Sequence, residues 1–270
     1  MNMKEAELIY NKIWKQLSKD ALAHIKEDPF LGGMLHTRIL TQKNLGESLS
    51  QVLAAQLGDH NLPTLQLQNL FNEVYSSHKK VLYAAAYDIQ AVVERDPACS
   101  TPLEPLLLFK GFQALQAYRA AHILWKGGRK LLAQILQSSI SRAFGVDIHP
   151  AATIGHGILI DHATNIVIGE TAKVGDNVSI LHGVTLGGTG KDTGDRHPKI
   201  GDGVLISAHA QLIGNIKVGK NAKIGAGAVV LTNVPAHTTF AGVPARRVGI
   251  PDSAVPSFDM KHDLKDYAGL

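Results

Sequence analysis

The chain has 270 residues, a formal net charge of +4 and a single cysteine, Cys99, so it can hold two domains but no intramolecular disulfide. No run approaches the roughly 18 apolar residues of a membrane helix, and the N-terminus lacks the apolar core of a signal peptide, which predicts a cytoplasmic protein without membrane contact. The positive excess lies in residues 1–145, whereas residues 146–270 carry 11 basic and 11 acidic side chains, so no nucleic-acid surface is expected.

The first half of the chain has the apolar spacing of helices. Asn44, with Glu47 three residues later, is typical of an N-cap box, and Gly58 fits the C-cap of the same helix. The predicted helices cover residues 3–27, 44–57, 64–94, 106–125 and 129–144. We therefore expect an all-helical domain over residues 1–145, with its aromatic side chains in the core or at subunit contacts.

From Ile148 to Ala236 an aliphatic residue returns every six positions. The members of this series are Ile148, Ile154, Ile160, Ile168, Val174, Ile180, Leu186, Ile200, Ile206, Leu212, Val218, Ile224, Val230 and Ala236. A period of six with β-branched residues at the repeating position indicates a parallel β-helix. The fold class is therefore α+β, with a β-helix over residues 146–250 and a flexible tail over residues 251–270.

Two insertions interrupt the repeat, and both contain histidine. The first adds two residues within 161–167, and the second is a polar loop at 187–199. Because the regular wall of a β-helix has few concave surfaces, we expect a site at its start or at these interruptions. A histidine that acts as general base is commonly oriented by an aspartate, and these places contain both residue types. The alternative is that each histidine is simply a solvent-exposed polar residue. The candidate residues are Asp147, His149, His156, Asp161, His162, Asp195, Arg196 and His197.

Three further patterns bear on ligands. His162 and His182 each follow a repeat residue by two positions, so we expect them to stack one coil apart, about 5 Å. Zinc can bind to histidines on such a fold, but no third histidine shares this register, so no metal is expected. The run 187–191 differs from a phosphate loop, because Asp192 stands where Ser or Thr is needed. Ala208 and Ala226 lie one coil apart and leave a groove for a thin ligand, or simply fit a corner.

Several motifs closely resemble the bacterial serine O-acetyltransferases of the hexapeptide-repeat acyltransferase family. They are Asp147-Ile148-His149-Pro150-Ala151-Ala152, Asp161-His162-Ala163-Thr164 and the runs 184–191 and 194–200, with further similarity at 88–98 and 110–119. The resemblance implies a left-handed β-helix, trimers paired into hexamers, and acetyl transfer from acetyl-CoA to L-serine in cysteine biosynthesis. It also implies feedback inhibition by L-cysteine.

The resemblance assigns roles by motif. His162 is expected to be the general base, oriented by Asp147. The residues expected to bind the amino group of serine are Asp96 and Asp161. Those expected to bind its carboxylate are Arg196 and His197. The residues expected at the pantetheine arm are Gly188, Ala208 and Ala226. Those expected at the CoA phosphates are Lys223, Arg246 and Arg247. The C-terminus is expected to bind O-acetylserine sulfhydrylase, although it ends in Leu270 where the family usually has isoleucine.

Three other functions remain open from the sequence. The acceptor could be a different hydroxyl, on a sugar or an antibiotic. The same fold could hold a zinc lyase, such as a carbonic anhydrase. The chain could also serve as a structural scaffold for its partner.

Overall fold

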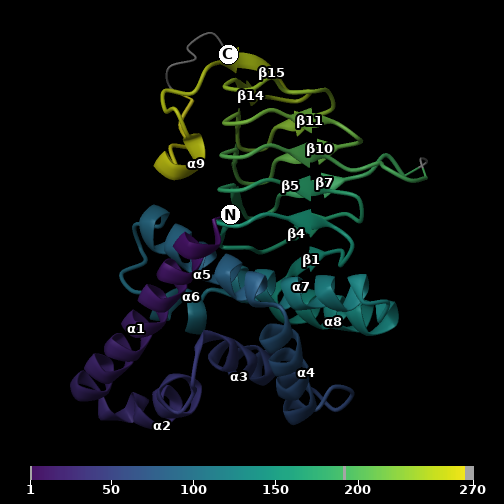
Figure 1. The fold of residues 1–270 in the computed structure, drawn as a ribbon. Coiled ribbons are helices and arrows are strands. Elements are labelled where there is room, and N and C mark those ends of the chain that lie inside the picture. The colour runs from purple at the N-terminus through teal and green to yellow at the C-terminus, as the bar shows by residue number, and fades with distance from the viewer. Residues whose placement is uncertain (1, 191–192, 265–270) are drawn as a thin grey trace.

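The computed structural model describes residues 2–190 and 193–264. Helices form one end of the molecule, and a parallel β-solenoid rises from them (Figure 1). One continuous hydrophobic core includes buried residues of both parts, from Ile13 in the first helix to Ala245 near the end of the solenoid. The two parts are therefore packed on each other rather than joined by a loose linker.

The helical part follows the predicted pattern in most places. Its elements are α1 (Met3–Glu27), η1 (Pro29–Leu31), α2 (Gly32–Leu35), η2 (His36–Leu40), α3 (Leu45–Leu57), α4 (Thr64–Ser77), α5 (Lys79–Arg95), α6 (Leu103–Leu107), α7 (Lys110–Lys126) and α8 (Lys130–Phe144). The predicted N-cap of α3 is confirmed, because Asn44 Oδ1 accepts a hydrogen bond from the Glu47 backbone N–H at 3.1 Å. None of the helices in the described ranges is long and apolar enough to cross a bilayer.

Two predicted helices have different bounds in the structure. The pattern over 64–94 is two helices, because His78 leaves the helical region at φ −131° and ψ 65°. The helix predicted from residue 106 begins instead at Lys110, since Leu108 adopts φ −124° and closes the short α6. Apolar spacing continues across both breaks, so periodicity alone could not reveal them.

The solenoid has three parallel sheets, and each complete coil adds one strand to each sheet. Sheet A contains β1 (Val146–Ile148), β4 (Ile166–Ile168), β7 (Thr185–Gly187), β10 (Gln211–Ile213) and β13 (Val229–Val230). Sheet B contains β2 (Thr153–Ile154), β5 (Lys173–Val174), β8 (Lys199–Ile200) and β11 (Lys217–Val218). Sheet C contains β3 (Leu159–Asp161), β6 (Ser179–Leu181), β9 (Leu205–Ile206), β12 (Lys223–Ile224), β14 (Thr239–Ala241) and the antiparallel β15 (Arg246–Gly249).

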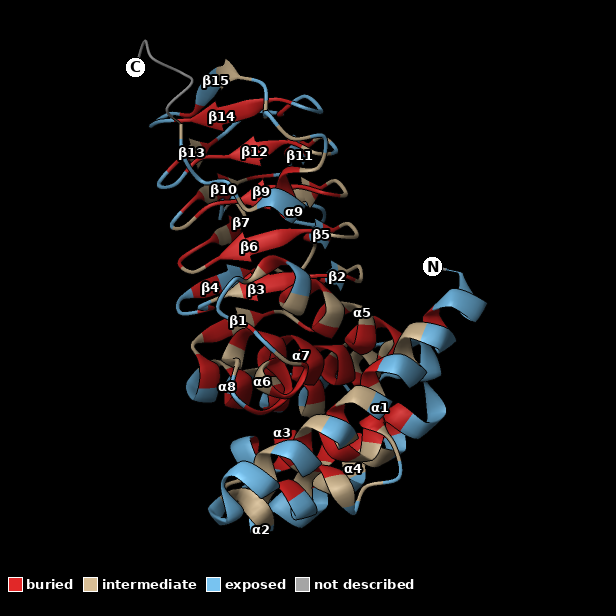
Figure 2. Cartoon of the chain, turned by 90° about the vertical axis from the view of Figure 1, so that its left-hand side faces the viewer, coloured by how far each residue is buried: buried red, intermediate tan, exposed pale blue. Residues whose placement is uncertain are grey.

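The six-residue repeat sets the register of these sheets. Repeat residues pair with repeat residues of the next coil, as Ile148 does with Ile168 and Ile160 with Ile180. All members of the series except Ile154 and Ala236 are buried, and the strands appear as a buried stack in Figure 2. The β-helix prediction is therefore confirmed.

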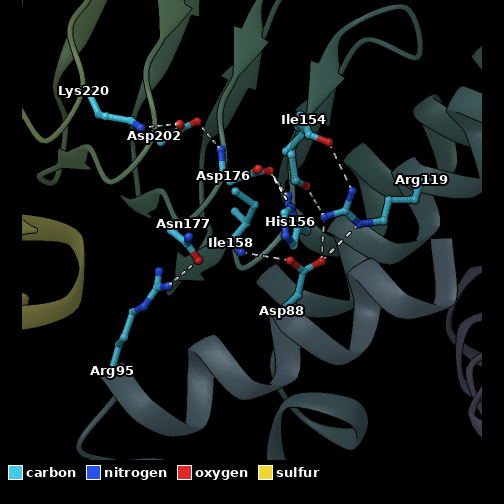
Figure 3. Close-up of polar contacts among 11 residues, drawn as sticks. Asp88, Arg95, Arg119, Ile154, His156, Ile158, Asp176, Asn177, Asp202 and Lys220 are labelled. Atoms are coloured by element: carbon cyan, nitrogen blue, oxygen red, sulfur yellow. Dashed lines mark hydrogen bonds and ion pairs between the residues drawn. The ribbon is translucent and has the colours of Figure 1, made fainter. Parts of the chain in front are cut away.

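A buried ion pair joins the helices to the first coil (Figure 3). Arg119 Nη2 of α7 lies 2.7 Å from Asp88 Oδ2 of α5, and both side chains are almost fully buried. The other oxygen of Asp88 accepts the Ile158 backbone N–H at 2.9 Å, while Arg119 donates to the carbonyl oxygen of Gly155 at 2.6 Å. Both charges thus have hydrogen-bonded partners, and α5 and α7 have a fixed position against the solenoid.

The described part of the tail lies against sheet C. The short helix α9 (Pro256–Asp259) packs on β9 and α5, and Figure 2 shows it in front of the sheet. The Ser179 hydroxyl donates to the Ser257 carbonyl oxygen at 2.8 Å, and the guanidinium of Arg95 stacks 4.4 Å over the ring of Phe258. The sequence predicts a flexible tail because its composition is polar and proline-rich, but the contacts up to Leu264 come from partners distant in sequence. The docking prediction for Leu270 falls outside the described residues.

Candidate active site

Asp161 and His162 lie on the turn that links sheet C to sheet A, here called the histidine corner (residues 161–165). Its two-residue insertion is accommodated by left-handed backbone, with φ of 54° at His162, 60° at Ala163 and 61° at Asn165. The His162 side chain is 75% exposed, and its Nε2 lies 3.9 Å from Asp161 Oδ1. The imidazole is therefore accessible to a substrate and carries no strong hydrogen bond to Asp161.

The helical domain reaches the histidine corner. Lys110, the first residue of α7, donates from Nζ to Thr164 Oγ1 at 2.5 Å. A Cβ on Gly111 would lie 2.2 Å from the Ile160 carbonyl oxygen, so only glycine allows this close approach of helix and strand. Asp96 is the half-buried C-cap of α5, which packs against β3. The helix that ends at Asp96 therefore lies on the sheet C side of the solenoid, and among the described residues no hydrogen bond or ion pair joins Asp96 to the histidine corner.

Arg196 and His197 lie on a different turn, between sheets A and B. This arginine corner comprises residues 169–171 and 194–198. Arg196 Nη2 donates to Glu170 Oε2 at 2.8 Å. The Thr171 hydroxyl oxygen accepts the backbone N–H of Arg196 at 3.0 Å and that of His197 at 3.1 Å. The loop that the sequence marks as an interruption is thus anchored on the coil before it.

Electrostatics at the arginine corner favour a neutral His197. Its Nδ1 accepts the Thr171 backbone N–H at 3.2 Å, which leaves the proton of the neutral ring on Nε2. Burial lowers the pKa of His197, and the neighbouring Arg196 lowers it further. The hydrogen bond from Arg196 holds the pKa of the Glu170 carboxyl below its usual range. A Cβ on Gly169 would lie 2.0 Å from His197 Nε2, so the ring needs glycine beneath it.

Asp147 lies on β1, and its Oδ1 accepts a hydrogen bond from Gln137 Nε2 at 2.6 Å. Among the described residues, no hydrogen bond joins Asp147 to His162. Strand β1 nevertheless pairs with β4, the strand that follows the histidine corner. The two residues are therefore on neighbouring segments without being in contact in this structure.

His149 is two residues beyond Asp147 and faces the arginine corner. Its ring meets the Trp125 ring edge-on, with centroids 5.0 Å apart. Burial lowers the pKa of His149, while the charges of Glu170 and Asp147 act in the opposite direction. His156 is at another corner, where its Nδ1 lies 2.6 Å from Asp176 Oδ1 (Figure 3).

The two corners lie at opposite edges of sheet A. A three-residue strand spans about 10 Å, so within one chain the strands of sheet A separate Asp161 and His162 from Arg196 and His197. The predicted serine residues are therefore gathered into two groups rather than one.

The predicted pantetheine residues are also divided. Ala208 and Ala226 form a column above His182, because the Gly227 N–H donates to the Ala208 carbonyl oxygen and the His209 N–H donates to that of His182. Gly188 belongs to the other edge of sheet A, where its Cβ position lies 3.3 Å from His197 Nε2.

The predicted phosphate-binding cations lie in the upper coils. Lys223 of β12 is buried, and its Nζ donates to the Asp263 carbonyl oxygen at 2.6 Å. Arg246 and Arg247 of β15 are exposed.

The expected stacking of His162 and His182 is confirmed, with ring centroids 5.7 Å apart. A third histidine, which does not share their register, also contacts this pair, because the His209 ring lies 4.8 Å from that of His182. His209 is one position out of register, and its ring reaches back over Gly183, which has no side chain to exclude it. Within the described residues, no group of three or more His, Cys, Asp or Glu side chains could hold a metal ion.

The sequence reasoning missed Glu170 and Thr171. Both follow the repeat residue Ile168 and Gly169, so aligning coil on coil would have placed them beneath the polar loop. Such an alignment places Glu170 and Thr171 near the loop without showing which of its residues they contact, and the structure pairs Glu170 with Arg196.

Comparisons with known proteins agree with this architecture. Residues 13–117 match the family described as serine acetyltransferase, N-terminal, and residues 197–232 match the bacterial transferase hexapeptide family. The serine acetyltransferase of Salmonella typhimurium is 53% identical over 248 residues, covering 92% of this chain and 91% of that protein.

Solved structures are similar over most of the chain. A serine acetyltransferase in complex with cysteine has a TM-score of 0.92 and 50% identity, covering 94% of this chain and 99% of the other. The soybean serine acetyltransferase complexed with serine has a TM-score of 0.87 and 51% identity, covering 89% and 99%.

The solenoid of hexapeptide repeats and the similarity to these relatives define an acyltransferase of the hexapeptide-repeat class. The match of the helical domain and the sequence identity over nearly the whole chain identify a particular family within this class. The chain belongs to the serine acetyltransferase family.

Proposed function

We propose that this chain transfers the acetyl group of acetyl-CoA to the hydroxyl oxygen of L-serine, giving O-acetyl-L-serine and CoA in cysteine biosynthesis. The observation that carries the proposal is the charge pattern of the two corners. Asp96 and Asp161 offer carboxylates to an ammonium group, with the exposed His162 available to a hydroxyl. Arg196 and His197 offer N–H donors to a carboxylate. A zwitterionic hydroxy amino acid has all three groups, and the family members solved with serine and with cysteine support this substrate class.

His162 is assigned as the general base. A serine hydroxyl is a weak nucleophile, so His162 removes its proton as the oxygen attacks the thioester carbonyl carbon. The tetrahedral intermediate collapses with cleavage of the C–S bond, and the proton on His162 passes to the departing CoA sulfur. Asp147 orients the imidazole and stabilises its protonated form, which requires its carboxylate to exchange Gln137 for His162 when substrate is bound.

A complete site requires two subunits. One serine molecule is shorter than the width of sheet A, so it cannot contact both corners of the same chain. In a homo-oligomer, a trimer or a hexamer of two trimers, the arginine corner of one subunit can face the histidine corner of its neighbour. The division of Asp161 and His162 from Arg196 and His197 supports this arrangement.

The acetyl-CoA site is assigned by proximity to His162. Small side chains at Ala208 and Ala226 leave the column above the histidine corner open for a pantetheine arm, with Gly188 contributed by the facing corner. The cations assigned to the CoA phosphates are Lys223, Arg246 and Arg247. We assign no metal to the reaction.

Ligand chemistry also suggests the regulation and partners. L-cysteine has the same ammonium and carboxylate groups as L-serine, so it should compete for the two corners as a feedback inhibitor. The aliphatic side chain of Leu270 suits the proposed binding of the tail to O-acetylserine sulfhydrylase. The supply of acetyl-CoA and serine favours a cytoplasmic location.

The test is a CoA-release assay with acetyl-CoA and a panel of acceptors. The panel contains L-serine, D-serine, L-threonine, a hexose and an aminoglycoside. We expect thiol release with L-serine and formation of O-acetyl-L-serine by mass spectrometry. Turnover with the hexose or the aminoglycoside, and none with L-serine, would support the alternative acceptor and overturn the proposal.

A further inference from the structure

We propose that His182 is a positioning residue that holds the His162 imidazole in one orientation, and that His209 supports His182 from the next coil. This role rests on the proposed function of His162 as general base. It adds two residues to the reaction that neither corner motif includes.

His162 needs an external support. Its backbone lies in the left-handed region at φ 54°, its side chain is 75% exposed, and the contact to Asp161 at 3.9 Å is longer than a hydrogen bond. In the described chain, the ring packed against His162 is that of His182, at 5.7 Å and an interplanar angle of 82°. This edge-to-face geometry is a favourable arrangement for two aromatic rings.

His182 is fixed by packing. Its Nδ1 is buried and has no hydrogen-bond partner among the described residues. The His209 ring covers it at 4.8 Å with an interplanar angle of 89°. The His209 backbone N–H also donates to the His182 carbonyl oxygen at 2.9 Å, which keeps the two coils in register.

Gly183 makes room for this stack. A Cβ at Gly183 would lie 2.3 Å from Nδ1 of His209, so any side chain there would displace the ring. The three imidazoles thus form a continuous row over three coils, which begins at the proposed base and ends beside the alanine column assigned to pantetheine. A row of this kind can fix the direction of the base at the point where the thioester meets the serine hydroxyl.

The kinetic test separates orientation from binding. Misplacing a catalytic group by about 1 Å can cost on the order of 100-fold in rate, so we expect His182→Ala to lower kcat at least about tenfold. KM for serine and for acetyl-CoA should stay within about twofold, because His182 is assigned to neither substrate. His209→Ala should give a smaller loss of kcat. A His182→Ala enzyme with kcat within about twofold of the unsubstituted protein would overturn the proposal.

Two matched variants show whether the effect of His182→Ala comes from the lost ring or from the lost ring nitrogens. His182→Phe keeps an aromatic ring but has no ring nitrogen. Its kcat should lie within about threefold of that of the unsubstituted protein, because the packing of residue 182 against His162 is kept. If His182→Phe is as slow as His182→Ala, ring nitrogen chemistry is needed and the positioning role is wrong. The control is His237→Ala, because His237 is an exposed histidine that also has left-handed backbone, at φ 53°. We expect its kinetics to match the unsubstituted protein, with thermal unfolding confirming that each variant is folded.

A crystallographic measurement tests the orientation without turnover. Crystal structures of the full chain and of His182→Ala should show one His162 ring orientation in the first and a displaced or divided one in the second. An unchanged His162 ring in His182→Ala overturns the positioning role. If the full chain does not acetylate L-serine, the proposed function fails, and this structural comparison still decides whether His182 orients His162.

Discussion

The backbone N–H of Thr171 donates to His197 Nδ1 at 3.2 Å, and the Thr171 hydroxyl oxygen lies 2.9 Å from the same nitrogen. One residue of the preceding coil therefore fixes the tautomer of the buried histidine. Nε2 therefore carries the proton of the neutral ring, and under the proposed function this N–H and Arg196 bind a carboxylate together.

Acidification should destabilise the protein through His197. Because burial lowers its pKa in the folded chain, the unfolded chain takes up the proton first as the pH falls below the ordinary histidine value of about 6.5. The free energy of unfolding should therefore decrease over that window and recover as the pH rises. Thermal unfolding at about pH 7.5 and about pH 5.5 measures this loss, which should be smaller in His197→Gln. An equal loss in both proteins would exclude His197 as the source, and His237→Gln provides the matched control.

Thr171→Val should weaken serine binding. The substitution keeps the shape of the side chain but removes the acceptor for the backbone N–H groups of Arg196 and His197. We expect KM for L-serine to rise about tenfold, which corresponds to a net cost of about 1.4 kcal/mol for the two lost backbone hydrogen bonds, with KM for acetyl-CoA unchanged. Steady-state kinetics with each substrate varied in turn provides the measurement. Thr232→Val, at an exposed position, should change neither constant, and an unchanged serine KM in Thr171→Val would remove Thr171 from the site.

His162→Ala should lower kcat by about 100- to 10,000-fold, the usual contribution of a general base. The side chain is mostly exposed, so the fold should persist, and circular dichroism and the assembly size should match those of the unsubstituted protein. Serine-dependent CoA release is the measurement. Retained turnover in a folded His162→Ala protein would assign the base to another residue.

Asp88→Ala should destabilise the chain by about 3–5 kcal/mol, because it leaves the buried Arg119 without its partner. Replacing both residues with apolar ones, as in Asp88→Leu with Arg119→Met, should recover much of this loss. Glu73→Ala is the control, since both side chains of the Glu73–Arg129 pair are solvent-exposed and the pair should contribute little. Urea unfolding of the four proteins measures the differences, and equal effects of Asp88→Ala and Glu73→Ala would contradict the role of the buried pair.

The β-helix could be predicted from the sequence because its signal is local and periodic. Ile168 and Leu186 lie three six-residue steps apart, and Leu212 continues the series after the polar loop. All three occupy the same inward position of their coils. The break at His78 was not predictable in this way, since α4 and α5 continue the same apolar spacing and only the backbone dihedrals distinguish them.

The site was predictable in its residue types but not in its grouping. Asp161, His162, Arg196 and His197 stand out because they interrupt the repeat. That they lie at opposite edges of sheet A depends on the order of the sheets around the solenoid, which residue spacing does not reveal. The Glu170–Arg196 pair and the reach of His209 over Gly183 likewise depend on contacts between coils.

Under the proposed function, the separation of the two corners by sheet A predicts that each chain carries two half-sites. A chain with His162→Ala keeps a sound arginine corner, and a chain with Arg196→Ala keeps a sound histidine corner. We predict that both chains are inactive alone and that their co-assembly unites the intact halves, so that a mixture regains a fraction of the activity.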